Sequence, residues 1–88
     1  MNVAFTPQGL QDLFYWSEND KKKVLLIEKL IKDIKRNRYQ GIGHPKPLTG
    51  DKSGWYRRII DKEHRLVYRI VNDEVIEIAQ CKGHYNDK

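Results

Sequence analysis

The sequence contains a single cysteine and no long apolar run, and these absences exclude several classes of protein. Cys81 has no partner within the chain for a disulfide, and no paired-cysteine zinc spacing exists. No stretch approaches the ~20 apolar residues of a membrane-spanning helix, and residues 1–10 lack the basic start and apolar run of a secretory leader. These features predict a soluble protein of the reducing cytoplasm, without membrane contact.

The motifs of common catalytic and metal sites are also missing. There is no glycine-rich phosphate loop and no nucleophile elbow. The three histidines, at positions 44, 64 and 84, do not have the short spacing of metal ligands on a helix or hairpin. The sequence therefore predicts neither a metal ion nor a cofactor.

The composition indicates one small folded domain, residues 1–88, with a basic surface. The 39% hydrophobic residues can fill one core, and 33% charged residues are typical of a folded surface. A net charge of +5 favours an acidic or polyanionic partner, because lysine and arginine neutralise phosphates. The same charge can serve solubility alone, and composition does not choose between the two.

Two helices are predicted near the N-terminus. Thr6 is an N-cap candidate and Pro7 occupies the tolerated first helical position, although Gly9 weakens the first turn. Asp20 can cap a second segment, residues 21–37, whose apolar side chains fall on one face at helical spacing.

The second half of the chain has the alternation of β-strands. Residues 72–74 read as a hairpin turn between the last two strands. An antiparallel sheet covered on one face by the two helices is expected, which is an α+β fold. The expected strands are residues 2–5, 55–60, 65–71 and 75–82.

Alternation also assigns side chains to the two faces of this sheet. In the strand over residues 65–71 the apolar side chains share one face, and Arg65 and Arg69 lie on the other, uncovered face. In the last strand, alternation places Glu77, Ala79 and Cys81 opposite Ile76 and Ile78. A rigid guanidinium suits a phosphate, but a cross-strand ion pair with an acid such as Glu77 is the alternative, and the pattern alone slightly favours it.

A loop over residues 39–54 contains four of the six glycines and two of the three prolines. Such composition excludes a helix or a central strand, and long loops of this kind often bind ligands. A slack linker is the alternative. Pro45 and Pro47 argue against it, because they hold the backbone extended around Lys46.

The candidate chemical groups form a cationic set with two proton donors: Lys46, Arg57 or Arg58, Arg65, His84 and Tyr85. Cleavage of RNA by its own 2′-hydroxyl needs a base, cations for the phosphorane charge and an acid for the leaving 5′-oxygen. Arginine supplies the cation and histidine can supply the acid. Lysine, ordinarily protonated at neutral pH, is a poor base, and a histidine near a chain end is more often simply solvated.

The residues themselves resemble the YoeB/Txe toxin family, within the wider RelE/ParE superfamily. The motifs P-x-P-L, S-G-W, E-H-R-L-V-Y and a terminal H-Y carry the resemblance, which covers nearly the whole chain. It implies a sheet with helices on one face, similar to microbial ribonucleases. It also implies an mRNA interferase that cuts messenger RNA in the ribosomal A site, without a metal, by 2′-hydroxyl attack.

The resemblance also implies roles for individual residues. Lys46 stands where the family has the glutamate that acts as general base, Arg65 would stabilise the phosphate, and His84 would protonate the leaving oxygen. The paired arginines lie one position earlier than the family pattern, so the choice between Arg57 and Arg58 stays open. Impaired cleavage with retained binding is therefore expected, whether position 46 is natural or engineered. Further expected RNA contacts come from Tyr85 and Arg69.

The expected partners are a cognate antitoxin similar to YefM, with an acidic C-terminal segment, and the 70S ribosome with its mRNA and rRNA. The resemblance leaves room for a homodimer. One alternative is a catalytically inactive variant that still binds the ribosome and antitoxin. Another is the gyrase-poisoning branch of the superfamily, which lacks the catalytic histidine; His84 argues against it.

Overall fold

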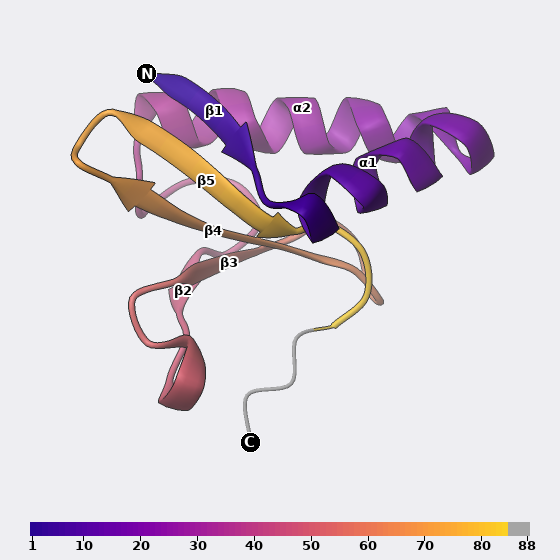
Figure 1. Cartoon of the computed structure of the whole chain (residues 1–88). Coiled ribbons are helices and arrows are strands. Elements are labelled where there is room, and N and C mark those ends of the chain that lie inside the picture. The colour runs from indigo at the N-terminus through magenta and orange to yellow at the C-terminus, as the bar shows by residue number, and fades with distance from the viewer. Residues whose placement is uncertain (85–88) are drawn as a thin grey trace.

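The computed structural model describes residues 1–84, which form a five-stranded sheet with two helices packed on one face (Figure 1). The strand order is β1-β5-β4-β3-β2, and every neighbouring pair is antiparallel except β1 and β5, which are parallel. The predicted α+β architecture is confirmed. The elements are β1 (Asn2–Phe5), α1 (Pro7–Asn19), α2 (Lys21–Arg36), β2 (Lys46–Pro47), β3 (Tyr56–Ile59), β4 (Arg65–Val71) and β5 (Val75–Gln80), with a 3-10 turn at Gly50–Lys52.

Both helices begin at the predicted caps. The Thr6 side chain accepts a hydrogen bond from the Gly9 amide at 3.1 Å, and the Asp20 side chain accepts one from the Lys22 amide at 3.1 Å. Gly9 has a packing role, because a Cβ atom there would lie 2.5 Å from the carbonyl oxygen of Ile78. The glycine therefore lets α1 approach β5 closely, at the cost of some helix propensity.

The hydrophobic core lies between the helices and the sheet. The amphipathic stripe of α2 predicted from the sequence faces this core. The buried residues of the core include Trp16, Ile27, Leu30 and Ile34 from the helices and Leu66, Tyr68, Ile76 and Ile78 from the strands.

A register shift between β4 and β5 changes one predicted assignment. Val67 lies opposite Gln80 while Tyr68 lies opposite Ile78, so Ala79 is an extra residue on β5. A bulge reverses the alternation of every residue that follows it. The prediction that Cys81 shares the face opposite Ile78 is therefore wrong: Cys81 is buried in the core, and burial raises the pKa of its thiol to about 12.

The proline-rich loop is extended around Lys46, as predicted, and it also forms regular structure. Lys46 and Pro47 make the edge strand β2, with Lys46 directly opposite Arg57 of β3. A proline is tolerated there because an edge strand does not need every backbone donor. Lys46 and Arg57 thus form a fixed cross-strand pair, and this part of the loop is not a slack linker.

Candidate functional site

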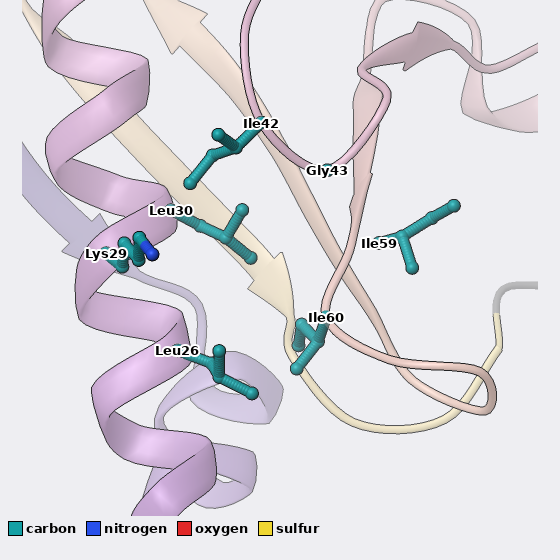
Figure 2. Close-up of a pocket in the computed structure, with 7 residues that line it drawn as sticks. All are labelled: Leu26, Lys29, Leu30, Ile42, Gly43, Ile59 and Ile60. Atoms are coloured by element: carbon teal, nitrogen blue, oxygen red, sulfur yellow. The ribbon is translucent and has the colours of Figure 1, made fainter.

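Three cationic residues share the face of the sheet that the helices leave uncovered. Lys46 lies opposite Arg57, and Arg65 lies opposite Ile59, on adjacent strands. Directly opposite residues project to the same face of a sheet, and residues 57 and 59 also share a face. Figure 2 shows Ile59 pointing away from α2 while Ile60 points toward it. Lys46, Arg57 and Arg65 therefore project away from the helices.

None of these three charges is paired with a carboxylate within residues 1–84. Arg57 Nη1 donates to the carbonyl of His44 at 2.8 Å, and Arg65 Nη1 donates to the carbonyl of Asp61 at 2.7 Å. Carbonyl oxygens orient a guanidinium without cancelling its charge.

One donor at this site is left without an acceptor. The Nε atom of Arg57 is buried and has no hydrogen-bond partner in the described part of the chain. A buried donor without an acceptor is costly. Because this atom has almost no exposed surface, an anion could accept from it only after the Arg57 side chain moved, so what the uncovered face offers a phosphate is its positive charge.

Arg69 lies further along β4 and is already engaged. Its Nε donates to Glu77 Oε1 at 2.6 Å, and its guanidinium carbon lies 4.5 Å from the centre of the Trp55 ring. The cross-strand ion pair that the sequence pattern slightly favoured is thus confirmed for Arg69, whereas Arg65 forms none within residues 1–84. Arg69 therefore offers less unpaired charge than Arg57 or Arg65.

Arg58 points to the helix side of the sheet and is therefore not part of the candidate site. Its side chain is fully buried, and Nη1 lies 2.5 Å from Asp33 Oδ2. The remaining guanidinium donors reach the carbonyls of residues 37, 40 and 42. The prediction that Arg58 contacts RNA needs correction, because alternation along β3 turns it inward and leaves Arg57 outward.

The Arg58–Asp33 pair holds the start of the loop that leads to β2. The hydrogen bond from Arg58 keeps the pKa of the Asp33 carboxyl below its usual value, against an opposing effect of burial. Asp33 also accepts from the Ile42 amide at 3.0 Å. The pair of buried Arg58 and partly buried Asp33 thus holds the loop from which Lys46 emerges.

The segment that carries His84 is attached beside Arg65. The Arg65 amide donates to the Gly83 carbonyl at 3.0 Å, and the Gly83 amide donates to His64 Nδ1 at 2.8 Å. His84 follows directly and is exposed. The structure therefore places the backbone next to His84 against the start of β4, while Tyr85 lies outside the described residues.

Sequence reasoning missed the side chains that hold this segment. The carboxylate of buried Asp12 accepts from the Cys81 amide at 3.0 Å, and Trp16 Nε1 donates to the Cys81 carbonyl at 2.8 Å. An available signal was the spacing of Asp12 and Trp16, which puts an acidic side chain on the apolar face of α1.

Away from the cationic face, the described surface also has a mainly apolar cavity. This cavity of about 190 Å³ lies between α2 and the loop before β2, and its lining is apolar apart from Lys29 (Figure 2). Across residues 1–84 no cluster of three histidine, cysteine or acidic side chains could hold a metal ion. No helix in that range is long and apolar enough to cross a membrane.

Comparison with known proteins agrees with this geometry. The family model described as the YoeB-like toxin of bacterial type II toxin-antitoxin system matches residues 5–85. The chain belongs to the YoeB-like toxin family. Over 85 residues the toxin is 44% identical to Toxin YoeB of Streptomyces coelicolor, covering 97% of this chain and 100% of that protein.

Two solved structures from Staphylococcus aureus share the fold of the toxin. One is the YoeB dimer, with a TM-score of 0.89 and 48% identity, covering 97% of this chain and 98% of that chain. The other is the heterotetrameric YoeB-YefM toxin-antitoxin complex, with a TM-score of 0.89 and 45% identity over the same shares.

Proposed function

We propose that this toxin is a metal-independent endoribonuclease that cuts mRNA in the ribosomal A site by 2′-hydroxyl attack, and that Lys46 impairs the reaction. The observation that carries the proposal is a pair of guanidiniums, Arg57 and Arg65, that have no carboxylate partner in the described part of the chain and lie near the segment that bears His84. Family membership supports the same assignment.

The proposed roles follow from the chemistry of each group. Arg65, mounted on a strand, stabilises the charge that develops on the phosphate, and Arg57 on the adjacent strand adds positive charge to the same face. His84 is exposed and directly follows Gly83, whose carbonyl accepts from the Arg65 amide, and it protonates the leaving 5′-oxygen. Tyr85 assists from the adjacent position in sequence, and Arg69 contributes a weaker RNA contact because Glu77 holds it.

Lys46 occupies the position proposed for the general base. It faces Arg57 across β2 and β3, so two cations stand side by side where the reaction needs a proton acceptor. Protonated lysine accepts no proton, and loss of a general base lowers the rate by about 10²–10⁴. The added positive charge leaves attraction for RNA intact. A catalytically inactive toxin that still binds ribosome and antitoxin is the second candidate, and the same cation pair favours it.

The proposed partners are the 70S ribosome with its mRNA and rRNA, and a cognate antitoxin similar to YefM with an acidic C-terminal segment. The net charge of +5 and the S. aureus YoeB-YefM complex support the second. The S. aureus YoeB dimer supports a homodimer of this toxin. Ribosome-dependent action places the toxin in the cytoplasm.

The test is cleavage of a defined mRNA on programmed ribosomes by the parent, Lys46→Glu and Lys46→Gln. Glutamate restores a base and should raise the rate by about 10²–10⁴, whereas glutamine removes only the charge and should not. A 2′-O-methyl group at the cleaved nucleotide should block the reaction.

Equal cleavage by the parent and Lys46→Glu would refute the role of position 46. If neither the parent nor Lys46→Glu cleaves the mRNA while both bind ribosomes, the toxin is the catalytically inactive binding protein of the second candidate.

A further inference from the structure

We propose that His64 is a positioning residue, which holds the C-terminal segment so that His84 stays beside Arg65. The consequence for RNA cleavage rests on the proposed function, whereas the placement of the segment does not. Nothing in the motif comparison distinguishes His64 from its neighbours in the E-H-R-L-V-Y stretch. The contacts of its imidazole do.

The hydrogen bond from Gly83 fixes the state of the His64 ring. The Gly83 amide lies 2.8 Å from Nδ1, and a backbone amide can only donate. Nδ1 must therefore carry a lone pair, so the ring is neutral with its proton on Nε2. A protonated ring would present a hydrogen to the Gly83 amide and break the contact.

The ring of His64 packs on α1, and the backbone of His64 is tied to α2 through Asp61. The ring lies edge-on against Trp16 of α1, with 4.7 Å between ring centres. The backbone amide of His64 donates to Asp61 Oδ1 at 2.9 Å, and Asp61 Oδ2 pairs with Lys23 of α2 at 2.6 Å. The acceptor for Gly83 is thus rigidly mounted on the helical layer.

The segment is clamped at two successive points, and His64 forms the second. Asp12 and Trp16 bind the backbone of Cys81 on both sides. At Gly83 the backbone turns through a positive φ of 78°, with Arg65 on one side and His64 on the other. Loss of the His64 contact would leave Cys81 fixed and free the turn that directs His84.

Charged groups surround His64 from each packed element. Asp61 and Glu63 lie in the same turn as His64, and Lys23 of α2 pairs with Asp61. Asp12 of α1 accepts a hydrogen bond from the Cys81 amide, and Arg65 is the first residue of β4. The hydrogen bond that Lys23 donates to Asp61 raises the pKa of Lys23. The pKa of Asp61 is lowered, because its bonds to Lys23 and to backbone amides outweigh the opposing effect of burial. Lys23 and Asp61 therefore stay charged near neutrality, so the ion pair that anchors the turn of His64 persists there.

The first experiment follows the Gly83 amide and the imidazoles of His64 and His84 by NMR across pH 5–8 in the full chain. We expect the Gly83 amide to lose hydrogen-exchange protection at the pH where His64, not His84, takes up a proton. His84→Gln serves as the control and should leave this transition in place. A Gly83 amide that follows His84, or that stays unprotected throughout, would overturn the proposal.

The second experiment compares two substitutions at position 64 in the Lys46→Glu background. His64→Asn keeps an acceptor near the position of Nδ1 but does not titrate, whereas His64→Phe keeps the ring against Trp16 and lacks the acceptor. His64→Phe should deprotect Gly83 and lower the cleavage rate at saturating ribosomes by about 10–100-fold, as for a misplaced catalytic group. His64→Asn should retain both properties and remove the pH dependence of the amide.

The outcomes separate the two proposals. If His64→Phe keeps Gly83 protected, or if both substitutions weaken it equally, the acceptor does not position the segment. If Lys46→Glu shows no cleavage, the proposed function fails, and the Gly83 amide alone decides whether His64 holds the segment. Thermal unfolding of each variant checks that the fold is kept.

Discussion

The ion pair between buried Arg58 and partly buried Asp33 should be the most sensitive electrostatic contact in the fold. Arg58 is fully buried and lies 2.5 Å from Asp33, which also accepts from the Ile42 amide. Asp33→Asn keeps the shape and an acceptor for Ile42 but removes the charge. A buried guanidinium left without a carboxylate costs about 3–5 kcal/mol, a large part of the ~5–15 kcal/mol that stabilises a typical domain.

Urea unfolding at pH 7 measures this cost. We expect the free energy of unfolding to fall by about 3 kcal/mol or more, and Tm to fall by about 12 °C or more. The control is Glu28→Gln, the same change of carboxylate to amide at an exposed pair with Lys32, which should cost no more than about 0.5 kcal/mol. A loss for Asp33→Asn of less than about 1 kcal/mol would refute the reasoning on buried charge.

Three further outcomes are expected. The folded state lowers the pKa of Asp33 below 3.8, so the carboxylate stabilises the fold fully above that pH and stops doing so as the pH falls through the folded pKa. Asp33→Asn lacks this stabilisation, and its acid unfolding should therefore occur at a higher pH than that of the parent. Gly9→Ala should destabilise by about 1–3 kcal/mol, measured by urea unfolding, because the new Cβ would meet the Ile78 carbonyl at 2.5 Å; no loss would show that α1 moves freely. Arg57→Gln should reduce the salt dependence of RNA binding by about one phosphate contact, and Arg69→Gln should reduce it less; the reverse order would contradict the assignment of free charge.

Local signals in the sequence predicted the elements of the fold well. The caps at Thr6 and Asp20 mark the starts of the two helices, and alternation marks β4. The bulge at Ala79 was not predictable, because one extra residue leaves no mark in the pattern and yet reverses the side chains after it, including Cys81.

The site was predictable in part. Alternation placed Arg65 on the uncovered face, but the choice between Arg57 and Arg58 needed the register of β3 against β4. The role of His64 depends on a contact with Gly83, nineteen positions away in the chain, and such a contact follows from tertiary structure alone. Local patterns name candidates, and the sheet register decides which of them meet.

The most direct test of the site is a double-mutant cycle for RNA cleavage in the Lys46→Glu background. Arg65→Ala and His84→Ala are measured singly and together on programmed ribosomes, with ribosome binding measured in parallel. If both groups act on one phosphate, each single change should lower the rate by about 10²–10⁴ and the pair should lower it by much less than the product. Losses that simply multiply, or full activity in either single variant, would contradict a shared site on the uncovered face.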